Sequence, residues 1–296
     1  MSIQGNGKRR ALHFHHPPRR VVSLVPSLTE SLFDLGFGHS VVGITDYCIH
    51  PAEQLKDLPR LGGPKNPRVE EILALEPELV LANQEENRPQ VVEALEAAGI
   101  AVVVTFPKTV RQSLDVLWML VGLYQSHSAA ARLESLEFSL EWLQSASFEN
   151  IKRRYFCPVW QDTTASGLRW WMTFNHNTYV HDLLNLAGGK NIFSERLRSY
   201  PLAADLGEGA PVDAGDRDTR YPRVSLDEII GEDPEIIILP SEPFSFDETH
   251  KHAIVELMGD TAAVRTGRVS LVDGSLLTWH GTRLGKALQE LPGFFS

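Results

Sequence analysis

The chain has 296 residues, of which 43% are hydrophobic and 22% charged, and a formal net charge of −10. This length and composition indicate a globular protein of one large or two smaller domains. The acidic balance argues against nucleic-acid binding, which needs clustered Lys and Arg. No stretch approaches the ~20 apolar residues of a membrane-spanning helix, so we expect no membrane insertion.

Residues 1–18 are predicted to form a flexible N-terminal arm, because they are polar and basic. The arm contains three histidines that could bind a metal, although incidental clustering is the favoured interpretation: His13, His15 and His16. No apolar run of signal-peptide length is present. We therefore expect a cytoplasmic protein as the sequence stands, and a periplasmic or extracellular one if a leader was removed. Cys48 and Cys157 form no disulfide framework, and their state stays open.

Residues 19–127 alternate between short apolar stretches and amphipathic ones. Arg20–Val25 is predicted as the first strand, followed by a helix at 27–36 with a capping box of Ser27 and Glu30. Further strands are expected at 41–45, 79–82 and 101–105. Further helices are expected at 69–75, 89–98 and 109–124. Strands separated by helices of this length indicate parallel βαβ units, and hence an N-terminal α/β lobe.

The longest uninterrupted helical pattern is Ser128–Ala146, which contains neither Pro nor Gly. Its leucines recur at three- and four-residue spacing, the period of one helix face: Leu133, Leu136, Leu140 and Leu143. Ser128 is predicted as the N-cap. At the helical rise per residue this segment would extend roughly 28 Å. It is either a backbone helix that links two lobes or a packing helix within one large domain.

The alternation resumes in residues 147–296. Strands are expected at 154–160, 235–239 and 269–272. Helices are expected at 177–187, 225–230, 250–258 and 282–291. The Gly- and Asp-rich segment 204–221 is predicted to be the least ordered internal loop.

An internal repeat connects the two halves. Glu70–Leu81 matches Asp227–Ile238 without a gap, and Glu30–Gly38 matches His181–Gly189 in the same order. The sequence therefore predicts an α/β fold of two parallel-sheet lobes, 19–127 and 147–296, joined by a single long helix at 128–146. We expect the ligand cleft between the lobes, where loops from both would meet.

No nucleophile elbow, zinc-protease or P-loop motif is present, so a binding protein that needs no cofactor is favoured over an enzyme. The loops predicted at the strand ends are rich in aromatic residues, whose flat apolar faces suit a large planar ligand such as a tetrapyrrole. The alternative for Trp170 and Trp171 is a strand with one indole in the core. The candidate ligand-binding residues from these loops are Tyr47, Trp170, Trp171, Asn175, His176, Tyr179, Glu242, Phe244, Trp279 and His280.

Metal binding has two possible forms. Imidazole and carboxylate ligands suit Zn²⁺ or iron, and a direct site would draw on His176, His181, His280 and Glu242. The five-residue spacing of His176 and His181 does not place them on one helical face. The favoured form is a single axial histidine, His176 or His280, on a metal that the ligand itself carries.

Several stretches together resemble one family: RVVSLVPSLTESLFDLGFGHSVVGITDYCIHP, LGGPKNPRVEEILALEPELVLAN, HDLLNLAGGKNIF, RYPRVSLDEIIGEDPEIIILP and DGSLLTWHGTRLGKAL. They are similar to the helical-backbone (class III) substrate-binding proteins of ABC importers, the receptors for vitamin B12, haem and ferric siderophores. The resemblance spans Arg20 to Leu291.

This resemblance implies two lobes joined by one long helix, a cobalamin or ferric chelate as ligand, and an ABC permease as partner. It implies that Tyr47 and Tyr221 contact the ligand, and that Glu70 and Asp227 dock on the transporter. We expect a monomer. The alternative is a cytosolic enzyme, or a protein that binds Zn or Fe directly, built on the same fold.

Overall fold

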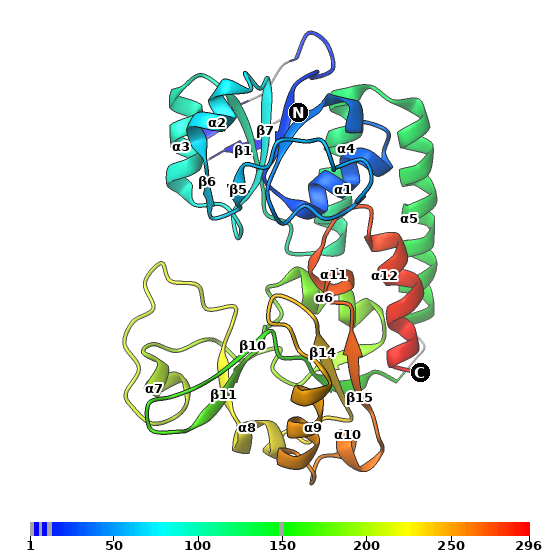
Figure 1. The fold of residues 1–296 in the computed structure, drawn as a ribbon. Helices are drawn as coiled ribbons and strands as arrows, with labels where there is room; N and C mark the ends of the chain where they lie inside the picture. Colours follow the sequence, from blue (N-terminus) through cyan, green and yellow to red (C-terminus); the bar gives the residue numbers. More distant parts are fainter. Residues whose placement is uncertain (1–2, 6–7, 11–13, 148–150) are drawn as a thin grey trace. The chain divides into compact units, whose positions relative to one another are not determined.

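A computed structural model describes residues 3–5, 8–10, 14–147 and 151–296 (Figure 1). The chain divides into two compact units. Unit 1 runs to Pro107 and adds Arg111–Phe138 and Trp279–Gly285, and unit 2 comprises Lys108–Val110, Ser139–Thr278 and Lys286–Ser296. Of the predicted N-terminal arm, His13 lies outside the described residues. Its described part includes the antiparallel strands β1 (Ile3–Gly5) and β2 (Lys8–Arg10).

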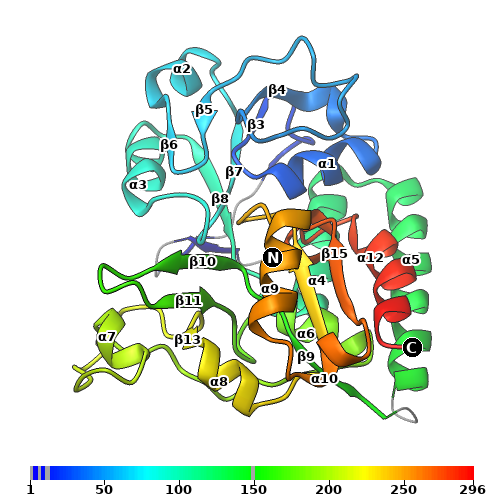
Figure 2. The same ribbon diagram turned by 60° about the horizontal axis from the view of Figure 1, so that its bottom comes forward.

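Unit 1 is built on a four-stranded parallel sheet in the order β4-β3-β7-β8 (Figure 2). Its apolar strands pack with helices α2 and α3 in one core, as is typical of a parallel sheet covered by helices. The strands are β3 (Val21–Ser23), β4 (Val41–Ile44), β5 (Gly62–Gly63), β6 (Asn66–Pro67), β7 (Leu79–Asn83) and β8 (Ala101–Thr105). The helices are α1 (Pro26–Asp34), η1 (Gly38–Ser40), α2 (Val69–Ala74), α3 (Pro89–Ala97) and α4 (Val110–Tyr124).

Unit 2 contains a second parallel sheet, β12-β9-β14-β15, and an antiparallel sheet, β10-β11-β13. The strands are β9 (Arg153–Phe156), β10 (Trp160–Thr163), β11 (Arg169–Met172), β12 (Gly189–Asn191), β13 (Arg223–Ser225), β14 (Ile236–Pro240) and β15 (Val269–Val272). The helices are α6 (Tyr179–Leu186), α7 (Leu202–Asp205), α8 (Leu226–Gly231), α9 (Glu248–Leu257), α10 (Ala262–Arg265), α11 (Ser275–Thr278), α12 (Leu284–Glu290) and η2 (Leu291–Phe294).

The two parallel sheets have the same plan, which confirms the predicted α/β fold of two repeated lobes. In each sheet, the first strand lies between the second and the third, and the fourth lies beyond the third. Glu76 and Asp233, which are equivalent in the sequence repeat, both adopt positive φ, at 44° and 39°. Each is followed by a Pro and then by the third strand of its sheet. The matched sequences therefore fold into matched backbones.

An arginine at the start of the first strand ties each sheet to a helix end in the same way. Arg20 donates from Nε to the carbonyl of Leu75, at the end of α2, over 3.0 Å. Arg154 donates to the carbonyl of Glu232, at the end of α8. Leu75 and Glu232 are equivalent in the repeat and are the C-caps of their helices. Because the last carbonyls of a helix lack helical partners, a guanidinium there satisfies acceptors that would otherwise stay unpaired.

The long helix predicted from Ser128 to Ala146 is confirmed as α5 (His127–Ser147). Its predicted cap is wrong, because the helix begins one residue before Ser128, and the Oγ of Ser126 accepts from the N–H of Ala129. The division between the units falls within this helix, after Phe138. The linking role that we expected of it, and the cleft between the lobes, stay predictions.

The capping box predicted for the first helix is also wrong. Helix α1 begins at Pro26 with Val25 as the N-cap, and no side chain caps it. Proline at the first helical position has the required φ and no N–H that needs a partner. Glu30 takes no part in capping the helix and instead forms an ion pair with Arg283.

Candidate functional site

Ligands of α/β folds bind at the carboxyl ends of the parallel strands, so the loops that follow these strands are the candidate ligand-binding regions. In unit 1, the loop after β4 carries Tyr47, whose side chain is 64% exposed. The same loop carries His50, whose ring meets the indole of Trp279 edge-on at 5.8 Å between centroids. Two candidate segments, far apart in the sequence, are thus brought together within unit 1.

His280 lies at the carboxyl end of the same sheet and is only 7% exposed. The side-chain amide of Asn83, the last residue of β7, donates to its Nε2 over 3.2 Å. Burial lowers the pKa of the His280 imidazole to about 4, because desolvation disfavours the charged ring. His280 is therefore neutral at pH 7, and an axial role for Nε2 would require the bond from Asn83 to be replaced.

In unit 2, Trp170 and Trp171 lie on β11, as the strand alternative expected. Trp171 has no exposed surface and packs in the main core of the unit with Phe156 and Val224. Trp170 is 7% exposed. The position of Trp171 favours a packing role, and contact of either indole with a ligand stays a prediction.

Asn175 is fully buried and joins two loops of unit 2. Its side-chain amide donates to the carbonyls of Arg196 and Thr219, and its backbone N–H donates to the carbonyl of Arg220. Tyr221, half-buried, follows directly after that carbonyl. Asn175 therefore supports the loop that carries Tyr221.

His176 and Tyr179, the candidates that follow Asn175 in the sequence, are fixed by neighbouring protein groups or buried. The Nδ1 of His176 lies 2.8 Å from the carbonyl of Ser194, and its Nε2 lies 3.0 Å from the side-chain amide of Asn177. Tyr179 is buried, and desolvation raises the pKa of its phenol. His176 therefore follows directly after the residue that bonds the Tyr221 loop, and its ring is held by Ser194 and Asn177.

Glu242 and Phe244 lie in the loop after β14. The Oγ1 of Thr278 donates to the Oε1 of Glu242 over 2.6 Å. The backbone of Gly274 lies so close to Glu242 that a Cβ at this position would clash with it, so the site requires glycine. Phe244 packs among aromatic rings, with centroids 4.7 to 5.4 Å away: Trp160, Phe246 and His250.

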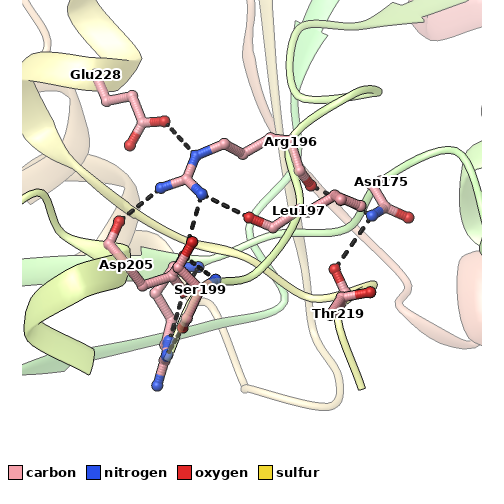
Figure 3. A network of polar contacts seen from close by, with 8 residues as sticks. Asn175, Arg196, Leu197, Ser199, Asp205, Thr219 and Glu228 are labelled. Atoms are coloured by element: carbon pink, nitrogen blue, oxygen red, sulfur yellow. Dashed lines mark hydrogen bonds and ion pairs between the residues drawn. The ribbon is translucent and has the colours of Figure 1, made fainter. Parts of the chain in front are cut away.

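A buried carboxylate that the sequence did not single out fixes the segment predicted to be least ordered (Figure 3). The side chain of Asp205 is fully buried and accepts from Arg196, Arg223 and the backbone N–H of Ser199 at 2.7 to 3.1 Å. Arg196 also donates to Glu228 on α8 over 2.8 Å. One Asp in a polar stretch gives no sequence signal of this role, because its donors come from distant positions.

The two predicted docking residues occupy equivalent places. Glu70 lies in the first turn of α2, and Asp227 lies in the first turn of α8. Both are exposed. An acidic group there is also favoured by the helix dipole, so their position alone does not indicate a partner.

The part of the chain that the structure describes contains neither a cluster of metal-binding side chains nor a membrane-spanning helix. Within residues 3–5, 8–10, 14–147 and 151–296, no three His, Cys, Asp or Glu side chains are grouped so that they could hold a metal ion. No helix in the same ranges is long and apolar enough to cross a membrane.

Comparison with known proteins identifies the family. The model of the periplasmic binding protein family matches residues 21–276. The vitamin B12-binding protein of Vibrio cholerae is 25% identical over 229 residues, which cover 75% of this chain and 70% of that protein. The vitamin B12-binding protein of Vibrio campbellii is 26% identical over 235 residues, covering 78% and 74%.

Solved structures show the same fold. The periplasmic vitamin B12-binding protein of Vibrio cholerae aligns with a TM-score of 0.73 at 20% identity, covering 94% of this chain and 97% of that one. A periplasmic haem-binding protein from Pseudomonas aeruginosa aligns with a TM-score of 0.68 at 24% identity, covering 94% and 92%. The matched family model, the repeated sheets and these alignments agree: the chain belongs to the periplasmic binding protein family.

Proposed function

We propose that this protein binds a corrinoid or another metal chelate without catalysing a reaction, as the substrate-binding component of an ABC-type importer. The observation that carries this proposal is the similarity to vitamin B12-binding proteins over three quarters of the chain. The structural likeness to a haem-binding protein supports the wider class of metal chelates.

The ligand contacts come from aromatic side chains in the loops of both units. Tyr47 in unit 1 is the most exposed of the aromatic candidates, and Tyr221 in unit 2 is half-buried on a loop fixed by Asn175. Trp279 adds a largely buried indole beside the Tyr47 loop. Flat rings that expose little polar surface suit the face of a corrin or porphyrin. If a histidine reaches the ligand's metal, His176 is the better candidate, because His280 is deeply buried.

Glu70 and Asp227 are proposed to dock on an ABC permease. They are exposed, acidic and equivalent in the repeat, so each unit presents one carboxylate at the start of a helix. Transporter docking implies a location outside the cytoplasm, and the protein acts as a monomer. Replacing both residues with Ala should abolish uptake and leave ligand affinity unchanged; unaltered uptake would exclude the docking role.

Titration of the purified protein tests the ligand class. Cyanocobalamin, haem and a ferric siderophore are each added, and binding is followed by tryptophan fluorescence and calorimetry. We expect at least one to bind with a Kd well below ~100 μM, as a receptor that scavenges a scarce ligand requires. Absence of binding by all three would contradict the proposal.

A further inference from the structure

Trp279 is held in place by Arg283 and His50, and all three residues belong to unit 1. The guanidinium carbon of Arg283 lies 4.8 Å from the centroid of its indole, within the range of a cation–π contact. His50 meets the ring from another element, edge-on. The indole is 8% exposed, so nearly all of its surface is defined by protein neighbours.

Arg283 is itself fixed by a two-pronged ion pair. Its Nε donates to Oε2 of Glu30 over 2.8 Å, and its Nη2 donates to Oε1 over 2.6 Å. The side chains are 8% and 14% exposed. This fork holds the plane of the guanidinium in one orientation, which a lysine ammonium cannot do. A nearly buried ion pair gives little net stability, because desolvation of both charges opposes their attraction. The orientation that the pair imposes on the Arg283 guanidinium therefore explains the pair better than a gain in stability does.

The backbone around Trp279 is held by other contacts. The N–H of Gly281 donates to Ser113 Oγ over 2.9 Å, and the N–H of Thr282 donates to Ser31 Oγ over 3.1 Å. Gly281 has φ +113°, and a Cβ at this position would clash with Ser31. These bonds do not involve the Arg283 side chain. Its loss should therefore release the indole without releasing the segment.

We propose that Arg283, oriented by Glu30, is a positioning residue that sets the plane of the Trp279 indole for contact with the ligand. This inference rests on the proposed function, because it assigns Trp279 to the ligand site. The guanidinium lies against the ring and limits its rotation, so the indole is already oriented before the ligand arrives. Pre-organisation of this kind reduces the ordering that binding would otherwise require.

The test uses the full-length protein labelled with 5-fluorotryptophan and the variant Arg283→Lys. Lysine keeps the positive charge but loses both the fork and the planar contact. The protein has six tryptophans, and Trp279→Phe assigns the fluorine resonance of Trp279 among them. We expect the Trp279 resonance to shift or broaden in the ligand-free variant while the others stay in place. Affinity for whichever ligand the wild type binds should fall about tenfold, because the indole would then have to be ordered on binding.

Two further variants make the result specific. Glu30→Gln keeps the shape of the side chain but removes one acceptor, so it should move the same resonance by less; it serves if Arg283→Lys does not fold. The control is Arg153→Lys, whose ion pair with Glu235 is more exposed and lies in unit 2. The control should change neither the resonance nor the affinity.

Each outcome has one meaning. An unmoved Trp279 resonance in both Arg283→Lys and Glu30→Gln overturns the positioning role, whatever the affinity. A moved resonance with unchanged affinity overturns the assignment of Trp279 to the ligand site. Failure of the wild type to bind any of the three ligands instead overturns the proposed function, and the fluorine spectra still decide whether Arg283 positions the indole.

Discussion

In both units, a side chain on the helix between the first and second strands of the parallel sheet accepts a hydrogen bond from a distant backbone N–H. Ser31 on α1 accepts from the N–H of Thr282, and Asp182 on α6 accepts from the N–H of Val110 over 2.7 Å. Ser31 and Asp182 are equivalent in the sequence repeat. Ser31 therefore holds a backbone N–H just before the start of α12, and Asp182 holds the first N–H of α4.

Each anchored segment is assigned to the unit whose side chain holds it. Lys108–Val110 belong to unit 2 although the rest of α4 belongs to unit 1, and Trp279–Gly285 belong to unit 1 although most of α12 belongs to unit 2. The two anchors are related by the same repeat that relates the sheets.

The units differ in the chemistry at neighbouring positions. Glu30 in unit 1 forms the ion pair with Arg283, whereas the equivalent His181 in unit 2 is a half-buried imidazole. Desolvation, and secondly the charge of His176, lower the pKa of His181 to about 4. Unit 2 also has the long loop that Asp205 fixes. The fold position is shared, but the polar groups are particular to each unit.

The largest expected effect concerns the loop that distinguishes unit 2. Asp205→Ala leaves Arg196 and the nearly buried Arg223 without their shared carboxylate. Removal of one member of a buried ion network typically costs about 3–5 kcal/mol. Urea unfolding of the variant should show that loss. The exposed pair of Lys56 and Glu53 provides the control, and Glu53→Ala should cost less than about 0.5 kcal/mol. Equal costs would show that the Asp205 network does not stabilise unit 2.

The second effect concerns pH and His280. Its folded pKa of about 4 lies below the ordinary value, so the unfolded chain binds the proton more tightly. The stability contribution of the neutral ring is complete above about pH 6.5 and is lost as the pH falls towards 4. That loss is roughly 3 kcal/mol for a shift of this size. His280→Gln should make this part of the stability profile in urea unfolding less steep, and His181, whose pKa is also lowered to about 4, should retain the rest of the slope. The exposed His39→Gln should leave it unchanged, and a wild-type profile for His280→Gln would contradict the assignment.

The third effect compares the two anchors directly. Asp182→Ala leaves the Val110 N–H without its carboxylate acceptor and should cost about 1–2 kcal/mol. Ser31→Ala removes a neutral acceptor and should cost about 0.5–1 kcal/mol. Asp182→Asn retains an acceptor and should recover part of the loss. The reverse order of the two alanine variants in urea unfolding would contradict the stronger role assigned to the Asp182 carboxylate.

The repeat made most of the fold predictable. Glu70–Leu81 and Asp227–Ile238 have the same apolar spacing and the same Pro, and they fold into the same helix and strand. The strand β12 was missed because Gly189–Asn191 carries no apolar side chain and pairs only through its backbone. Helix α7 was missed because Asp205 at its end is held by arginines at other positions in the sequence.

The candidate site was only partly predictable, for a related reason. The aromatic loops are visible as composition, but the sequence does not show which rings are buried. Both Trp171 and Tyr47 are candidates by composition, yet Trp171 is fully buried in the core of unit 2 and Tyr47 is largely exposed. The pair of Glu30 and Arg283 joins positions near opposite ends of the chain, and no local pattern indicates it.

The central claim is that a metal chelate is bound by aromatic residues from both units, and titration calorimetry with one variant in each unit tests it most directly. Tyr47→Ala in unit 1 and Tyr221→Ala in unit 2 are compared with the wild type for cyanocobalamin and haem. The claim predicts that the wild type binds one of them and that each variant weakens this binding about tenfold or more, as the loss of a stacked aromatic ring would. Wild-type affinity in both variants, or no binding by the wild type, would contradict it.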